Sequence, residues 1–213
     1  RFANKQRRRV MKVLIACELS AVVRDEFRKL GHDAWSCDIE ETEGDPRFHI
    51  KGDVLKVLTD GWDLMIAHPE CRYLCVSGLH WNGRRPGREE LSLQAFEFAS
   101  RLYHAPIEKI AIENPVGILS RHWGKPQYIQ PYQFGEDASK KTGLWLKNLP
   151  PLVGTKYIPP RLVVGADGKI RKRWSNQTDS GQNKLTPGPN RSRERARTYK
   201  GIAEAMAAQW GNL

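Results

Sequence analysis

The amino-acid sequence predicts an α/β fold built on a mostly parallel β-sheet with helices on both faces. From Lys12 onward, short strand-like apolar runs alternate with segments of helical periodicity. The first run, residues 13–17, is apolar throughout, which is typical of a strand covered on both faces. The 213 residues are enough for one domain with a substantial core. No apolar stretch approaches the roughly 20 residues that span a bilayer, so we expect no membrane segment.

Five strand-like runs are expected to form the parallel part of the sheet. A polar or reactive residue follows the last four of them, namely Asp38, Asp53, Cys71 and Glu113. Open α/β sheets bind ligands at the carboxyl ends of their strands, so these four residues are candidates for a site. The five runs are residues 13–17, 34–37, 48–50, 63–68 and 110–112.

Three helices and four further strands complete the prediction. The first helix is expected to begin at an N-cap, Ser20, and to end at Gly31. Residues 127–134 and 142–146 resemble strands, and residues 162–164 and 169–171 a small hairpin. The apolar faces of the helices are Val23, Phe27 and Leu30; then Leu91, Ala95, Phe98, Ala99 and Leu102; then Ile202, Ala205, Met206 and Trp210.

Changes in composition divide the chain into four parts. Residues 1–10 are basic and lack the apolar core of a secretory signal, so we expect a leader without fixed structure. Residues 11–150 form the core of the fold. Residues 151–195 are rich in Pro, Gly, Lys and Arg and suit a short basic insert that binds nucleic acid. Residues 196–213 return to the core as a helix.

The net charge of +11 comes from 35 Lys and Arg against 24 Asp and Glu, and the isoelectric point is near 9.7. The excess is clustered at residues 7–9, 84–85, 140–141, 171–173 and 191–197. Such clusters favour a polyanionic partner such as nucleic acid, and the alternative is a set of solvated charges that keep the protein soluble.

The four cysteines, at positions 17, 37, 71 and 75, fall in or beside the strand-like runs. This arrangement differs from the disulfide framework of a small secreted domain. We therefore expect free thiols in a reducing cytoplasm.

Cys71 and Glu113 form the candidate catalytic pair, a nucleophile and an acid on neighbouring strands. The alternative for Cys71 is a small buried apolar residue. A zinc set of His68, Cys71, Cys75 and His80 is a further alternative, but the spacing is unusual and we predict no metal.

Asp38 and Asp53 suit a nucleoside, one carboxylate for the ribose hydroxyls and the other for a ring amine. Each aspartate also suits the cap of a following turn. The loop after the first strand contains Cys17, Glu18 and Ser20 but no glycine, so it is a poor phosphate cradle. A methionine-derived nucleoside therefore fits better than a dinucleotide. Three aromatic residues near these sites either stack on a base or belong to the core: Tyr73, Trp81 and Trp145.

Residues 63–71, which end in His-Pro-Glu-Cys, followed by Ile112-Glu113-Asn114, resemble the DNA cytosine carbon-5 methyltransferases. The catalytic strand of that family ends in Pro-Pro-Cys and the next strand in Glu-Asn. The likeness extends over residues 11–211 in family order, most closely to small phage and prophage members. The parts of the chain that correspond to further family motifs are a cofactor loop at 16–21, acids at 38 and 53, a basic segment at 140–142 and a closing helix entered at 198–201.

The resemblance implies a Rossmann-like class I methyltransferase fold, a bacterial or phage-encoded cytoplasmic enzyme, and DNA as partner; we favour a monomer. Cys71 would add to carbon-6 of a flipped-out cytosine while Glu113 protonates ring nitrogen-3. S-adenosylmethionine would be held by Cys17, Glu18, Ser20, Asp38, Asp53 and Gly201. The substrate and DNA contacts would come from Asn114, Lys140, Lys141, Arg171, Arg173, Arg195 and Arg197.

Two residues depart from the family pattern. Glu70 replaces a proline beside the nucleophile, where its charge is expected to raise the pKa of Cys71, and Ala21 stands in a cofactor loop without glycine. These departures favour a second hypothesis, in which Glu70 is catalytic, methylene-tetrahydrofolate is the donor and the product is 5-hydroxymethylcytosine. A third hypothesis is a DNA-binding module without catalysis. The short insert predicts loose sequence preference.

Overall fold

The computed structural model describes residues 9–189 and 191–213. One sheet has the strand order β3-β2-β1-β4-β5-β7-β6. The first five strands are parallel, and β7 runs antiparallel to β5 and β6. The expected Rossmann-like α/β fold is confirmed. The strands are β1 (Lys12–Ala16), β2 (Asp33–Asp38), β3 (His49–Lys51), β4 (Leu64–Ala67), β5 (Lys109–Pro115), β6 (Gln127–Ile129) and β7 (Thr142–Lys147).

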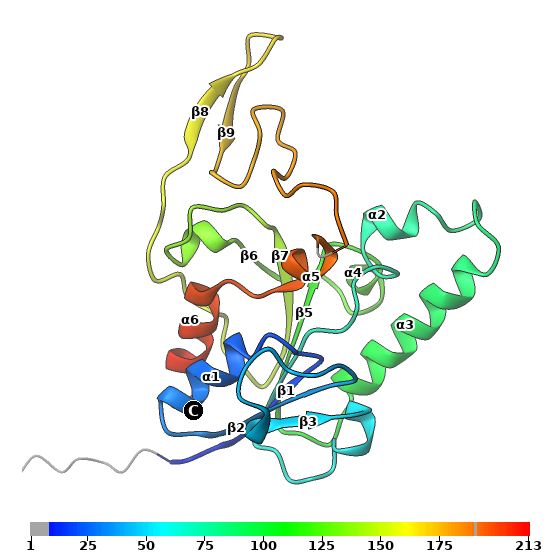
Figure 1. Cartoon of the computed structure of the whole chain (residues 1–213), viewed down its shortest axis with the longest axis vertical. Coiled ribbons are helices and arrows are strands. Elements are labelled where there is room, and N and C mark those ends of the chain that lie inside the picture. Colours follow the sequence, from blue (N-terminus) through cyan, green and yellow to red (C-terminus); the bar gives the residue numbers. More distant parts are fainter. Residues whose placement is uncertain (1–8, 190) are drawn as a thin grey trace, which may run out of the picture.

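Helices cover both faces of this sheet. Alternate residues of β1 point to opposite faces, so Val13 and Ile15 join one core cluster and Leu14 and Ala16 the other. Figure 1 shows α1 (Val22–Lys29) and α6 (Lys200–Trp210) together on one face and α3 (Arg88–Tyr103) on the other. All four apolar residues predicted for the last helix are buried.

The start of α1 differs from the prediction. The N-cap position is Ala21, in a left-handed conformation (φ 60°), and no side chain at that position caps the helix. The carboxylate of Glu18 accepts instead from the amides of Val23 (2.8 Å) and Arg24 (3.3 Å). Ser20 was therefore wrong as the N-cap; its hydroxyl donates to Glu18 at 3.3 Å.

The predicted apolar faces include two residues that are exposed, and two more, Ala95 and Phe98, that are only partly buried. Leu30 is 36% exposed and Leu91 is 40% exposed, because both lie at helix ends that extend beyond the core. The strand predicted over residues 127–134 stops at Ile129, since Pro131 has no amide hydrogen for a strand ladder and opens a 3-10 turn, η3 (Pro131–Gln133). The shorter elements were not predicted: α2 (Val76–Leu79), α4 (Leu119–His122), α5 (Arg191–Ala196), η1 (Pro46–Phe48) and η2 (Val54–Lys56).

The predicted hairpin is present as β8 (Arg161–Val164) and β9 (Ile170–Arg173), which form a separate two-stranded sheet. It extends away from the main sheet (Figure 1). Just after it, the buried ring of Trp174 stacks on Tyr132 with centroids 4.0 Å apart, which anchors the hairpin to the core.

The expected leader falls mostly outside the described residues, which begin at Arg9. None of the helices described has the length and apolar character needed to cross a membrane.

Candidate functional site

The strand register aligns several candidate residues along one edge of the sheet. Ala16 of β1 pairs with Cys37 of β2 and with Ala67 of β4, and Ala67 pairs with Ile112 of β5. The residues that come next therefore follow one another across the carboxyl ends of four neighbouring strands, in the order Asp38, Cys17, His68 and Glu113. Glu113 lies inside β5 rather than after it, because the strand continues to Pro115.

His68 and Glu113 form the central contact of this edge. The imidazole Nδ1 lies 2.6 Å from Oε2 of Glu113, and the two side chains are only 12% and 11% exposed. Burial lowers the pKa of His68, but the hydrogen bond and charge of Glu113, with the charge of Glu18, outweigh it and raise the pKa above its ordinary value. Burial raises the pKa of Glu113, but the bond from His68 and the charge of Lys140 bring it below its ordinary value. The geometry therefore favours a protonated imidazole beside an ionised carboxylate.

Cys71 and Cys75 lie one turn apart, because the amide of Cys75 donates to the Cys71 carbonyl at 2.9 Å. Their thiols share a hydrogen bond, which, followed by burial, raises the pKa of Cys71 far above its ordinary value. The same bond lowers the pKa of Cys75 to about 5. The two sulfurs together thus hold one negative charge at neutral pH. The charge of Glu113 adds to the raised pKa of Cys71.

The turn that carries Cys71 is locked onto β5 and the loop after it. Asn114 is buried, and its side-chain amide donates to the carbonyl of Pro69 at 2.9 Å. The amide of Val76 donates to Val116, and the amide of Ile118 donates to the carbonyl of Leu74. Asn114 was predicted to contact substrate; in the structure it holds the Cys71 turn in place.

Glycine is required where this turn crosses the loop after β5. A Cβ atom at Gly117 would lie 1.9 Å from the carbonyl oxygen of Leu74. No side chain fits at that distance, so the close crossing depends on this glycine.

The candidate cofactor residues surround Cys17, whose pKa is raised by burial and then by the charges of Asp38, Cys37 and Asp53. Both aspartates also cap turns: Asp38 accepts from the amide of Glu40 (3.0 Å) and Asp53 from the amide of Leu55 (3.0 Å). Because Asp38 is half-buried and Asp53 is exposed, each keeps carboxylate surface for a ligand.

The phosphate-binding position at the start of α1 is already taken. Helix N-termini bind anions through free amides, and here the buried carboxylate of Glu18 accepts from two of them. Two acids and no phosphate cradle fit a phosphate-free nucleoside such as S-adenosylmethionine.

Two predicted site residues, Glu70 and Gly201, have contacts that differ from those expected for their predicted roles. Glu70 is exposed and pairs with Arg72 at 3.4 Å. The raised pKa of Cys71 has the expected direction, but its largest causes are Cys75 and burial. Gly201 lies in the first turn of α6, where a Cβ atom would meet the carbonyl oxygen of Phe134 at 1.9 Å, so the glycine allows α6 to pack closely.

Comparison with known proteins finds similarity among solved structures only. No protein-family model matches the chain, and no curated protein matches it. Among solved structures, the chain is similar to a proposed DNA modification methyltransferase encoded within an E. coli prophage, with 13% identity and a TM-score of 0.46. The match covers 70% of this chain and 52% of the other, so this chain spans about half the length of that protein. The order and direction of the strands define the fold of this chain.

The two lysines before β7 differ in their surroundings. The charge of Lys140 acts on His68, Cys71 and Glu113, which places it beside the candidate site. The Nζ atom of Lys141 lies 4.0 Å from the centre of the Tyr128 ring, and this lysine is exposed. Lys140 is therefore close enough to influence the site's chemistry, whereas Lys141 faces outward.

Several predicted DNA-binding arginines are paired within the protein. Arg171 contacts Asp167 at 2.7 Å, and Arg173 donates to the carbonyl of Asp179 at 3.0 Å. Arg193 (2.6 Å) and Arg197 both contact Glu43, so α5 lies against the loop after β2. Arg195 is exposed. Exposed lysines at 169, 172 and 184 add positive surface along the hairpin and its following loop.

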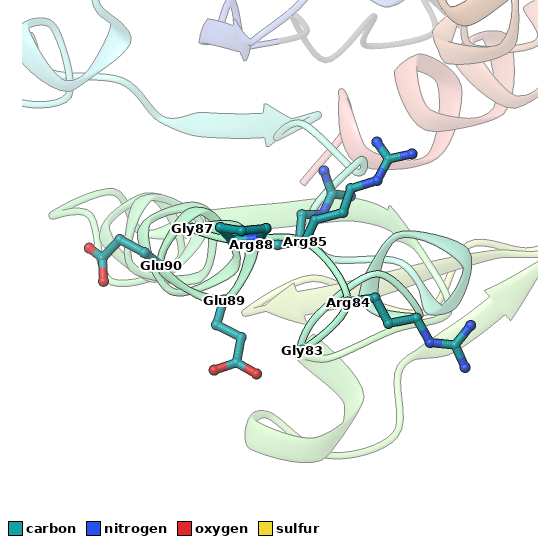
Figure 2. Close-up of a pocket in the computed structure, with 8 residues that line it drawn as sticks. Gly83, Arg84, Arg85, Gly87, Arg88, Glu89 and Glu90 are labelled. Carbon is teal, nitrogen blue, oxygen red and sulfur yellow. The ribbon is translucent and has the colours of Figure 1, made fainter.

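A second basic surface follows α2. Residues 83–90 line a shallow hollow, and Figure 2 shows Arg84 and Arg85 extending from the loop on one side while Glu89 and Glu90 lie on the other. Arg88 ties this loop to the Cys71 turn, since it donates to the carbonyl of Arg72 at 2.9 Å.

The three aromatic residues near the site have different surroundings. Trp145 is only 3% exposed and belongs to the core. The ring of Tyr73 is covered by Arg88 at 4.2 Å. Trp81 is 41% exposed, with the Arg85 guanidinium 4.3 Å from the centre of its ring. Trp81 is therefore the one of these three whose ring is substantially open for stacking.

Sequence reasoning missed the roles of His68 and Cys75. Both were considered as zinc ligands only, but in the described part of the chain no three His, Cys, Asp or Glu side chains form a metal-binding group. His80, the fourth candidate, pairs with Arg84 at 2.6 Å. The signal for His68 was available: it directly follows a buried strand adjacent to the strand of Glu113.

Proposed function

We propose that this protein is a DNA cytosine carbon-5 one-carbon transferase that acts through a covalent adduct between Cys71 and a flipped-out cytosine. The observation that carries this proposal is the arrangement at the sheet edge. The half-buried thiol of Cys71 lies in a turn that the buried amide of Asn114 holds against β5, the strand that also carries the buried carboxylate of Glu113. In this arrangement the thiol could attack one edge of a ring while the carboxylate holds the opposite edge.

The chain's own groups would supply the nucleophile, the acceptor for its proton and the acid. The sulfur of Cys71 bonds to carbon-6, and the thiol proton passes to Cys75. The ring electrons move toward nitrogen-3, which takes a proton from the Glu113 side. Carbon-5 would then take the one-carbon group from the bound donor, whose remainder departs as a neutral thioether. The carbon-5 proton would pass to solvent water and the nitrogen-3 proton would return to the Glu113 side. Cys71 would leave as the carbon-5 to carbon-6 double bond reforms, and it would regain its proton from Cys75. Lys140 stabilises the negative charges gathered at this edge.

The methyl group would come from S-adenosylmethionine, which supplies an electrophilic carbon when bound. Asp38 and Asp53 would hold its hydroxyl and amine groups beside Cys17. Glu18 fixes the loop by capping α1. No feature of Glu70 favours methylene-tetrahydrofolate as donor, because this residue is exposed and pairs with Arg72.

DNA would be held by the basic surfaces on either side of the site. We propose residues 151–195 as the recognition insert, with its exposed lysines on phosphates. Flipping a cytosine out of the duplex costs a few kcal/mol, and the exposed ring of Trp81 is a candidate for stacking on a base near the Cys71 turn.

The test is covalent trapping on DNA that contains 5-fluorocytosine, followed by mass spectrometry of nucleosides from unmodified DNA. Wild-type protein with S-adenosylmethionine is expected to form the adduct and to yield 5-methylcytosine. Cys71→Ser and Glu113→Gln are expected to form none, whereas Cys75→Ser retains slower trapping and serves as the matched thiol control.

Each other outcome points elsewhere. If trapping is lost in Cys75→Ser and kept in Cys71→Ser, the nucleophile is Cys75 and not Cys71. A hydroxymethyl product that requires methylene-tetrahydrofolate would replace the donor. DNA binding without any adduct or product would leave a non-catalytic DNA-binding module.

A further inference from the structure

His68 has no role in the chemistry outlined so far, yet it is the closest partner of the proposed acid. Its Nδ1 lies 2.6 Å from Glu113, a distance typical of a strong charge-assisted hydrogen bond. The backbone fixes this pair: Ala67 and Ile112 are in register, and the amide of His68 donates to the carbonyl of Ala16 at 2.9 Å. The second ring nitrogen, Nε2, is buried and has no hydrogen-bond partner among the described residues.

We propose that His68 stores the proton that Glu113 delivers to nitrogen-3 of the cytosine. This inference rests on the proposed function and adds a residue to it. His68 would act through Glu113 and is thus a positioning and proton-storing residue.

An ionised Glu113 has no proton to give. The surroundings of the pair lower the pKa of Glu113 and raise that of His68, so the proton of the resting protein lies on the imidazole. When the sulfur of Cys71 bonds to carbon-6, the ring electrons move to nitrogen-3. The proton then passes from Nδ1 to the carboxylate, and from the carboxylate to nitrogen-3. When Cys71 leaves, the same proton returns along the same path, so His68 ends the cycle as it began.

The charged groups around His68 support its role as a proton store. Glu113 faces it from β5 and Glu18 from the loop after β1, and both carboxylates favour the imidazolium. Lys140, from the segment before β7, opposes it. Burial raises the pKa of Glu18 and so weakens its negative charge, which leaves the direct bond to Glu113 as the main interaction that holds the proton on the ring until the substrate draws it away.

The experiment measures release of tritium from carbon-5 of cytosine in DNA, without any methyl donor, across a range of pH. This exchange requires adduct formation and proton transfer only. His68→Gln is expected to slow exchange by about 100-fold, the lower end of the range for a positioned proton donor. The ratio of wild-type to variant rate should stay constant below the pKa of His68 and fall as pH rises through it. His104→Gln, a histidine at the exposed end of α3, is the matched control and should match wild type.

A second measurement follows the His68 ring nitrogens by NMR in the protein without DNA. The imidazole should be protonated at neutral pH, and Glu113→Gln should lower its pKa. A neutral imidazole at pH 7 would overturn the proposal, whatever the exchange results.

The outcomes separate the two proposals. If wild-type protein exchanges tritium and His68→Gln follows an unchanged pH profile, the proton store is rejected and the proposed function stands. If the NMR titration behaves as expected but wild type exchanges no tritium and traps no 5-fluorocytosine, the proposed function fails and the proton store fails with it.

Discussion

The side-chain amide of Asn114 donates to the carbonyl of Pro69 at 2.9 Å and so joins β5 to the turn that carries Cys71. The adjacent residue, Glu113, bonds to His68 at the start of the same segment. Two consecutive residues of one strand therefore fix both the position and the protonation of the segment before the nucleophile.

Asn114→Ala is expected to lower the free energy of unfolding by about 1–3 kcal/mol, because the Pro69 carbonyl loses its buried donor. Urea denaturation measures the loss. Gln94→Ala, which removes an exposed bond to Glu90 on α3, should change stability by no more than a few tenths of a kcal/mol. Equal effects of the two changes would argue against a structural role for Asn114.

Gly117→Ala is expected to destabilise the protein by about 1–3 kcal/mol or more, because its Cβ would meet backbone that cannot yield. Gly188→Ala is the matched control, since no atom lies within 4 Å of the Cβ position there. Thermal unfolding of both variants gives the comparison. A Gly117→Ala protein as stable as the control would mean that the Leu74 turn shifts freely.

The His68 and Glu113 pair should make stability depend on pH in two directions. The pKa of His68 is raised above its ordinary value of 6.5, so its contribution is complete below that pH and is lost as pH rises through the folded-state pKa. The pKa of Glu113 lies below its ordinary value of 4.5, so its contribution is present above that pH and is lost on acidification. The stability difference between wild type and His68→Gln should therefore be largest between about pH 4.5 and 6.5. A difference that is constant from pH 4 to 9 would contradict this.

Cysteine alkylation should distinguish the two thiols of the Cys71 turn. Because the pKa of Cys75 is lowered to about 5 and that of Cys71 is raised, iodoacetamide at pH 6–7 should modify Cys75 first. Peptide mass spectrometry after short exposure reports the order. In Cys75→Ser, the pKa of Cys71 should fall toward its ordinary value. Prior modification of Cys71 in wild type would show that the proton lies on Cys75 instead.

DNA binding should weaken with salt, and the hairpin lysines should contribute to the slope. Each of Lys169→Ala and Lys172→Ala is expected to reduce the slope of log K against log salt by about 1. Lys29→Ala, on α1 and already paired with Glu26 at 2.6 Å, is the control and should leave the slope unchanged. Fluorescence anisotropy with a short duplex measures these slopes. Identical slopes for all variants would mean that DNA does not contact the hairpin lysines.

The positions of the main strands along the chain were predictable because apolar runs and the residues that end them are local features. The α6 face was equally clear, since Met206 and Trp210 repeat with helical spacing and are both fully buried. Short helices such as α2 were not predictable, because four residues carry no periodic signal. The cap of α1 was misplaced because Ser20 has the chemistry of an N-cap but lies one residue before the N-cap position. The carboxylate of Glu18 reaches the helix amides instead.

The candidate site was predicted less completely than the fold. Cys71 and Glu113 stand out in the sequence because each follows or ends an apolar run. The link from His68 to Glu113 and the sharing of a proton between Cys71 and Cys75 depend on strand pairing and turn geometry, which the spacing of residues does not specify. Whether Arg171 or Arg197 is open to DNA likewise depends on partners such as Asp167 and Glu43, which only the folded chain brings near.

The packing of α6 against α1 has a consequence for synthesis of the protein. The side of the sheet lined by Val13 and Ile15 is covered by α1 and by Met206 and Trp210 of α6, so a ribosome has made every strand of the sheet before that side has its complete cover. Until then the nascent chain exposes apolar surface that chaperones would have to shield. A premature stop codon ahead of α6 would therefore leave a product prone to aggregation and degradation, even though every residue proposed for chemistry had already been translated.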